Sequence, residues 1–94
     1  MLTKYLKTTS ILKLLSDPTR YRLIELLNTT NEELCVSEVA KRLNISQSTT
    51  SHQFAKLEDF GLVTPIRYGQ MICYKLSENK EVEKIKQILV MFTI

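Results

Sequence analysis

Glycine, proline, cysteine and histidine are scarce in this chain of 94 residues, which has two, two, two and one of them, and tryptophan is absent. So little glycine and proline excludes collagen-like and low-complexity classes and leaves no linker. Two cysteines are too few for the disulfide framework of a small secreted domain, so a reduced intracellular setting is expected. No apolar run approaches the ~20 residues of a membrane span, and lysines interrupt Met1–Leu15, which argues against a signal peptide. We expect a cytoplasmic protein without membrane contact.

Recognisable enzyme motifs are also missing. The chain has no glycine-rich phosphate loop, no Ser–His–Asp pattern with the right context and no carboxylate cluster at a familiar spacing. The single histidine, His52, lies among neutral polar residues that are poor material for an active site. We expect no enzymatic activity and no cofactor.

The composition is that of one ordinary globular domain over residues 1–94, with 44% hydrophobic and 24% charged residues. A net charge of +3 is weak evidence for a nucleic-acid partner, although the charge doubles in a dimer. No separate effector domain is expected beyond Ile94.

Apolar spacing and capping residues predict a series of helices. Asp17 and Ser46 can accept from helix N-terminal amides, Pro18 suits a first helical position, and Gly61 suits a helix stop. The first helix carries apolar Tyr5, Leu6, Leu12 and Leu15, and the fourth buries Thr50, Phe54 and Leu57. The predicted helices cover residues 3–15, the segment that follows Asp17 up to the polar cluster 28–31, a short helix capped by Ser37 that runs to Leu43, and a helix from Ser46 to about residue 60.

The C-terminal third predicts a β-hairpin and a last helix. Residues 62–67 and 70–76 form two strands joined at Tyr68-Gly69, and Pro65 restricts the first of them to an edge or irregular role. The final helix covers residues 79–92 and places Val82, Ile85, Leu89 and Phe92 on one stripe. The order α-α-α-α-β-β-α predicts a mainly α fold with a small β-hairpin, a winged helix–turn–helix.

The run Ser46–Gln53 is polar throughout and holds no acidic or basic side chain. Serine, threonine and histidine are mediocre helix formers, so an ordinary exposed helix would carry Glu, Lys, Arg and Ala instead. Hydroxyls and amides at a helix N-terminus can bond to base edges and phosphates in a DNA major groove. The run therefore indicates a sequence-specific DNA-binding regulator of transcription.

Several segments, in order over about residues 11–77, resemble the ArsR–SmtB family of repressors. They are L-S-D-P-T-R-Y-R-L-I (15–24), E-L-C-V-S-E-V-A (33–40), S-Q-S-T-T-S-H-Q-F (46–54), and G-L-V (61–63), R-Y-G (67–69) and Y-K-L (74–76) in the wing. The resemblance implies a homodimeric repressor that binds an imperfect palindrome in operator DNA until a metal, metalloid or redox signal lowers its affinity. It also implies dimerisation through the first and last helices. We interpret the stripe from Val82 to Phe92 as that dimer surface, with an intramolecular core as the alternative.

The same resemblance assigns the DNA contacts. Gln47 can address an adenine edge, the hydroxyls can bond bases or phosphates, and His52 can donate to a phosphate. Thr49 and His52 can instead be ordinary surface residues without a DNA contact. Phosphate contacts are also expected from Lys41, Arg42 and Lys56, with a solvated surface position as the alternative. No arginine lies in the recognition helix, so DNA shape and half-site spacing would supply much of the specificity. The expected DNA-binding residues are Gln47, Ser48, Thr49, Ser51 and His52, with Arg67 and Tyr68 in the wing.

The chain departs from the family at its sensor sites. A thiolate metal site in the third helix needs a Cys-x-Cys pair, but Ser37 follows Cys35 at the second position. The last helix has neither the aspartate nor the histidine of the other family site. We therefore expect no metal site. For Cys35 and Cys73 the favoured role is that of small buried apolar residues. Redox sensing or a disulfide is the alternative. The competing function is a redox or metal-responsive switch that acts mainly through protein contacts.

Overall fold

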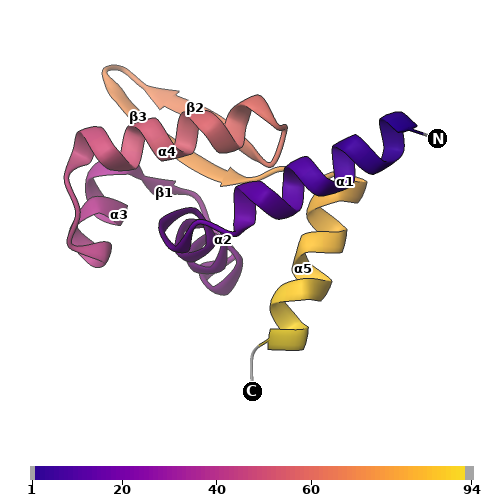
Figure 1. Cartoon of the computed structure of the whole chain (residues 1–94). Coiled ribbons are helices and arrows are strands. Elements are labelled where there is room, and N and C mark those ends of the chain that lie inside the picture. Colours follow the sequence, from indigo (N-terminus) through magenta and orange to yellow (C-terminus); the bar gives the residue numbers. More distant parts are fainter. Residues whose placement is uncertain (1, 93–94) are drawn as a thin grey trace.

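The structure, a computed structural model, describes the backbone of residues 2–92 and the side chains of residues 6–92. Figure 1 shows α1 and α5 at one end of the molecule and α3 with the hairpin tip at the other. The architecture is the predicted winged helix–turn–helix, with α3 and α4 as the helix–turn–helix and the hairpin as the wing. The elements are α1 (Leu2–Leu15), α2 (Pro18–Thr30), β1 (Leu34–Cys35), α3 (Val36–Leu43), α4 (Gln47–Asp59), β2 (Val63–Tyr68), β3 (Met71–Leu76) and α5 (Lys80–Phe92).

Strand β1 was not predicted, and it makes the hairpin part of a three-stranded antiparallel sheet of order β1-β3-β2. Leu34 lies opposite Tyr74 and Cys35 lies opposite Cys73. A strand of two residues is too short to give an alternating pattern, and only its pairing with β3 defines it. Strand β2 is at the edge, as Pro65 predicted.

The hairpin turn lies one residue later than predicted. Tyr68 is the last residue of β2 and pairs with Met71, so the turn consists of Gly69 and Gln70. Gly69 has a φ of 65°, a left-handed conformation that glycine adopts without a steric penalty.

Capping side chains mark the N-termini of α2 and α4. The Asp17 carboxylate accepts from the Arg20 amide at 3.0 Å, and Ser46 Oγ accepts from the Thr49 amide at 3.0 Å. The predicted cap at Ser37 is wrong, because α3 begins at Val36, two residues earlier than a cap at Ser37 would give. Its N-cap is Cys35, whose side chain makes no capping hydrogen bond. Pairing in β1 already gives Cys35 the extended backbone of an N-cap residue.

One continuous core draws side chains from the helices and the sheet. Phe54 of α4 is fully buried and stacks on the Tyr74 ring of β3 with 4.3 Å between ring centroids. Burial of these apolar side chains is the main force that fixes α4 against the sheet. The core comprises Leu14, Leu15, Leu23, Ile24, Leu27, Leu34, Val39, Phe54, Leu57, Leu62, Val63, Tyr74, Val82, Ile85 and Leu89.

The stripe on α5 belongs mostly to this core, so its interpretation as a dimer surface is wrong for Val82, Ile85 and Leu89. Only Phe92 of the predicted stripe is exposed, at 76%. Helical spacing alone cannot distinguish an intramolecular face from an intermolecular one. Among the described side chains of the two helices, the exposed large apolar ones are Leu6 and Leu12 on α1, where Leu15 is buried, and Val90, Met91 and Phe92 on α5. The Tyr5 side chain lies outside the described residues.

An ion pair joins the two terminal helices. Lys7 Nζ of α1 lies 2.8 Å from Glu81 Oε1 of α5. This hydrogen bond is the main reason that the pKa of Glu81 is lowered from its usual value. Among the residues that the structure describes, no helix is long and apolar enough to cross a membrane.

Candidate nucleic-acid interface

The polar run folds into the first half of α4, and Ser46 organises it. Ser46 Oγ donates to Thr49 Oγ1 at 2.8 Å, and the Ser46 carbonyl accepts from Thr50 Oγ1 at 2.9 Å. Thr50 is thereby satisfied within its own helix and is fully buried. All five DNA contacts expected on this helix are exposed, namely Gln47, Ser48, Thr49, Ser51 and His52. The helical repeat places Thr49 at the flank of the face that the other four share.

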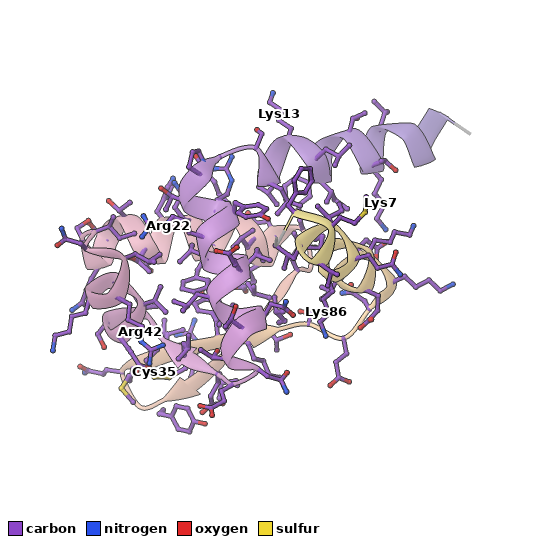
Figure 2. All side chains as sticks on the ribbon, turned by 90° about the horizontal axis from the view of Figure 1, so that it is seen from below. Lys7, Lys13, Arg22, Cys35, Arg42 and Lys86 are labelled. Atoms are coloured by element: carbon purple, nitrogen blue, oxygen red, sulfur yellow. A yellow bond between two sulfur atoms is a disulfide. The ribbon has the colours of Figure 1, made fainter. Side chains whose placement is uncertain are left out.

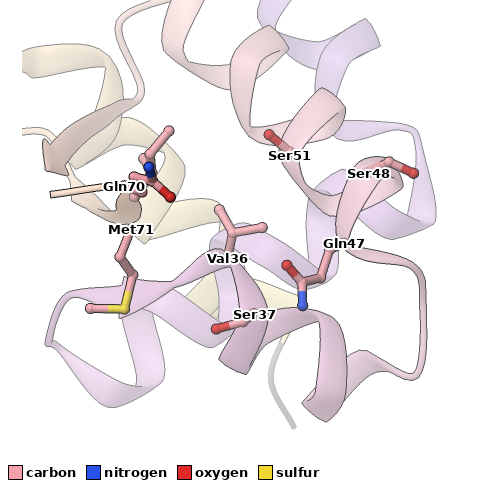
Figure 3. A pocket seen from close by; sticks show the side chains of 8 residues that line it. Val36, Ser37, Gln47, Ser48, Ser51, Gln70 and Met71 are labelled. Carbon is pink, nitrogen blue, oxygen red and sulfur yellow. The ribbon is translucent and has the colours of Figure 1, made fainter. Parts of the chain in front are cut away.

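An open groove of about 550 Å³ lies between this face and the wing. Figure 3 shows Gln47, Ser48 and Ser51 on α4 and, across the groove, the start of α3 and the hairpin turn. The sequence reasoning missed the groove-lining residues outside α4. These residues are Val36, Ser37, Gln70, Met71 and Ile72. In the sequence only Gln70 and Met71 had a signal, a polar or flexible side chain directly after the expected hairpin turn.

Arg67 is exposed on β2, opposite Ile72 of β3. Its charge lies near the Tyr74 hydroxyl, which donates to Glu58 Oε1 of α4 at 3.2 Å. Burial raises the pKa of Tyr74, the Glu58 carboxylate raises it further, and the Arg67 guanidinium lowers it in part. The predicted wing arginine therefore lies within electrostatic reach of the Tyr74 hydroxyl.

Tyr68 has a protein partner that the sequence did not reveal. Its hydroxyl donates to the Glu33 carboxylate in the segment before β1. This bond is the main reason that the pKa of Tyr68 is raised from its ordinary value of 10.0. The ring remains 50% exposed, so the contact ties the hairpin end to Glu33 and leaves the ring face accessible.

The helix–turn–helix also carries exposed basic side chains. Arg42 pairs with Glu38 one turn earlier in α3, with 3.2 Å between Nη2 and Oε2. The guanidinium of Arg42, which is labelled in Figure 2, is therefore partly neutralised by a carboxylate of its own helix. Lys41 and Lys56 are exposed on α3 and α4. Such cations can meet phosphates on either side of a major groove.

Cys35 and Cys73 are joined by a disulfide, and Figure 2 shows the sulfur of Cys35 near the edge of the sheet. The favoured interpretation of two separate buried thiols is therefore wrong, and the disulfide that the sequence left open is present. The reason is strand β1, which places the two residues directly opposite each other. The bond connects the N-cap of α3 to the central wing strand.

Within residues 2–92, no group of three or more His, Cys, Asp and Glu residues has a geometry that could hold a metal ion. The sulfur of Cys35, the one position that matches the first cysteine of the family's thiolate site, is bonded to Cys73.

Comparison with known proteins agrees with this architecture. The family model described as "Bacterial regulatory protein, arsR family" matches residues 17–64, from the N-cap of α2 into β2. The chain belongs to the ArsR family. The match includes the whole helix–turn–helix and its polar recognition helix.

Curated relatives are 29–38% identical to this chain over the aligned residues. An arsenical resistance operon repressor of Staphylococcus xylosus is 37% identical over 80% of this chain and 70% of its own length. A transcriptional repressor SmtB homolog of Synechocystis is 34% identical over 79% of this chain and 54% of its own length. This chain spans about half of that relative and 50% of a Halobacterium salinarum arsenical resistance operon repressor.

Solved structures of transcriptional regulators match nearly the whole chain. HlyU from Vibrio cholerae superposes with a TM-score of 0.85 at 30% identity, covering 99% of this chain and 98% of HlyU. The repressor BigR from Xylella fastidiosa superposes with a TM-score of 0.75 at 28% identity.

Proposed function

We propose that this ArsR-family chain is a homodimeric transcriptional repressor that binds a palindromic operator through α4 and the wing. The observation that carries the proposal is the exposed polar face of α4, from Gln47 to His52, beside the groove that the hairpin borders. The repressor names of its relatives point the same way.

The geometry suits the major groove of DNA. Helix α4 has 13 residues, about 20 Å, and its polar face is at the N-terminal end, where free amides and the helix dipole favour phosphate oxygens. Gln47 can make paired hydrogen bonds to adenine, while Ser48 and Ser51 can bond either bases or phosphates. Arg67 then approaches the backbone or the adjacent minor groove from the wing.

A palindromic operator needs two copies of the chain related by a twofold axis. The surface that supports dimerisation is formed by the exposed apolar side chains of α1 and α5. A depression of about 420 Å³ lies between these helices, with Ile11, Leu12 and Ile88 among its lining residues. We infer that a second copy covers this surface.

The test is fluorescence anisotropy of the purified protein on duplex DNA from upstream of its own gene, in a salt series with random-sequence competitor. We expect binding that resists competitor, and the logarithm of the binding constant should fall linearly with the logarithm of salt concentration. Replacing Ser48, Ser51 and His52 by alanine should reduce operator affinity about tenfold or more. The matched control is Thr29→Ala, exposed at the end of α2, which should bind as the wild type does. No preference over random DNA would overturn the proposal.

A redox response is the second candidate, and the Cys35–Cys73 disulfide favours it. A repressor works in the cytoplasm with its DNA, where thiols are reduced and a disulfide usually serves sensing or catalysis. Reduction would free the N-cap of α3 from the wing strand on one border of the groove. We expect dithiothreitol to change operator affinity of the wild type and to leave Cys73→Ala unchanged. Equal responses would exclude the switch.

The proposal assigns no catalysis and no metal-dependent induction to these residues. The thiolate site that the family resemblance implies needs a second cysteine, and this chain has Ser37 at that position. Adding zinc, cadmium or arsenite to the operator complex should therefore not release DNA. Release by any of them would identify a site outside the positions considered above.

A further inference from the structure

The corner between α1 and α2 leaves one backbone carbonyl without a helical partner. The residue four positions after Leu14 is Pro18, which has no N–H to donate. The side chain of Arg20 supplies the missing donor, because its Nε lies 2.7 Å from the Leu14 carbonyl oxygen. Asp17 fixes the backbone of the same residue by accepting from the Arg20 amide at 3.0 Å. Arg20 is thus held at the end of α1 by its main chain and its side chain.

The other end of the same guanidinium reaches the recognition helix. Arg20 Nη1 donates to Gln53 Oε1 at 3.1 Å. Gln53 is the last residue of the polar run, adjacent to His52, and it is half-buried, unlike the exposed contacts before it. Both hydrogen bonds of the bridge are partly shielded from water. A charged donor makes each of them stronger than a neutral hydrogen bond.

We propose that Arg20 is a positioning residue that holds α4 at a fixed angle to α1 and thereby sets the spacing of operator half-sites that the dimer accepts. This inference rests on the proposed function. Helix α1 carries part of the proposed dimer surface and α4 carries the DNA contacts, so a rigid link between them fixes the distance between the two recognition helices of a dimer. In dimeric helix–turn–helix proteins this distance must match the spacing of the half-sites.

Arginine suits this role and lysine does not. The planar guanidinium presents donors on different edges, so it can bond the Leu14 carbonyl and the Gln53 amide oxygen at the same time. A lysine ammonium is a single point charge on a flexible stem. It would keep the charge and lose the fixed geometry.

The test separates half-site sequence from half-site spacing. The full chain selects binding sites from a pool of duplexes with a random segment of about 30 base pairs, about three helical turns, and the bound fraction is sequenced. From the wild type we expect an inverted repeat with one dominant spacing. From Gln53→Ala we expect the same half-site sequence, with the ratio of the dominant to the next spacing reduced about tenfold.

Three further variants make the result specific. Gln53→Glu keeps an acceptor for the guanidinium and should restore the single spacing, although its charge weakens binding to all DNA. Arg20→Lys should broaden the spacing as Gln53→Ala does. Ser51→Ala, an exposed DNA contact of the same helix, should change the selected half-site and keep the spacing. Melting temperatures confirm that each variant is folded.

A Gln53→Ala pool with the wild-type spacing would overturn the inference, as would one with an altered half-site, which would make Gln53 a direct DNA contact. A wild-type pool of half-sites without a preferred spacing would also overturn it while leaving DNA binding intact. No enrichment by the wild type would instead refute the proposed function, and the inference with it.

Discussion

Side chains of the polar run Ser46–Gln53 make different kinds of contact although all of them are polar. Ser46 caps α4, and Thr50 is buried with its hydroxyl on the Ser46 carbonyl. Gln53 accepts from Arg20. Helical periodicity predicted that Thr50 faces inward, and the residue type predicted that Ser46 caps the helix. It could not predict the partner of Gln53, because that partner lies 33 positions away in sequence.

The first prediction separates the cap from the DNA contacts. Ser46→Ala removes the acceptor of the Thr49 amide, so we expect a loss of about 1 kcal/mol in the free energy of unfolding. Ser51→Ala, exposed in the middle of the same helix, should change the free energy of unfolding by less than about 0.5 kcal/mol. Urea unfolding followed by circular dichroism measures both. Equal losses in the two variants would contradict the assignment of the cap.

The second prediction concerns the pH dependence of Tyr74. Its pKa is raised above 10.0, first by burial and then by Glu58. The folded state thus favours the neutral phenol, and this contribution to stability is complete below pH 10.0 and lost as pH rises through the folded-state pKa. Above pH 10.0 the free energy of unfolding should therefore fall more steeply with pH in the wild type than in the Tyr74→Phe variant.

Tyr74→Phe keeps the ring that stacks on Phe54, so the two proteins can be compared at each pH. Urea unfolding at several values between about pH 8 and 11 gives the slopes. Glu58→Gln should reduce the slope without abolishing it, because burial is the larger cause. Parallel pH profiles for the wild type and Tyr74→Phe would show that Tyr74 ionises equally easily in both states.

Among the elements, strand β1 had no sequence signature and yet determines the state of both cysteines. The helices and the hairpin were predictable because their periodicity and caps are local. The pairing of Cys35 with Cys73 depends on contact between residues 38 positions apart. The short α3 shows the same limit, since its start at Val36 follows from β1 and not from the capping tendency of Ser37.

The third prediction measures what this disulfide contributes to the fold. The disulfide joins residues that are 38 positions apart in the sequence. Its reduction should lower the free energy of unfolding by about 2–4 kcal/mol, chiefly because the unfolded chain gains conformational entropy. Urea unfolding with and without dithiothreitol gives the difference. The matched control is the double variant Cys35→Ala, Cys73→Ala, whose free energy of unfolding should be the same with and without reductant. An unchanged wild type under reductant would show that the bond is not closed in solution.

For the whole molecule, the apolar stripe of α5 illustrates what periodicity leaves undecided. The spacing of Val82, Ile85 and Leu89 predicted one buried helix face. It did not predict whether that face packs against the same chain or against a second copy. The rest of the fold decides, because α5 packs these residues into the protomer core. The apolar surface that remains is a different one, at the C-terminal end of α5 and along α1.

The last prediction tests that remaining surface with one substitution at two matched positions. Met91 on α5 is 72% exposed and Met71 at the wing is 50% exposed. If a second copy covers α1 and α5, Met91→Glu buries a carboxylate in the interface, which costs several kcal/mol unless the dimer dissociates. Sedimentation equilibrium should then give monomers for Met91→Glu and dimers for Met71→Glu. A Met91→Glu dimer as stable as the wild type would place the interface elsewhere, and the link from α1 through Arg20 to α4 could no longer set the half-site spacing.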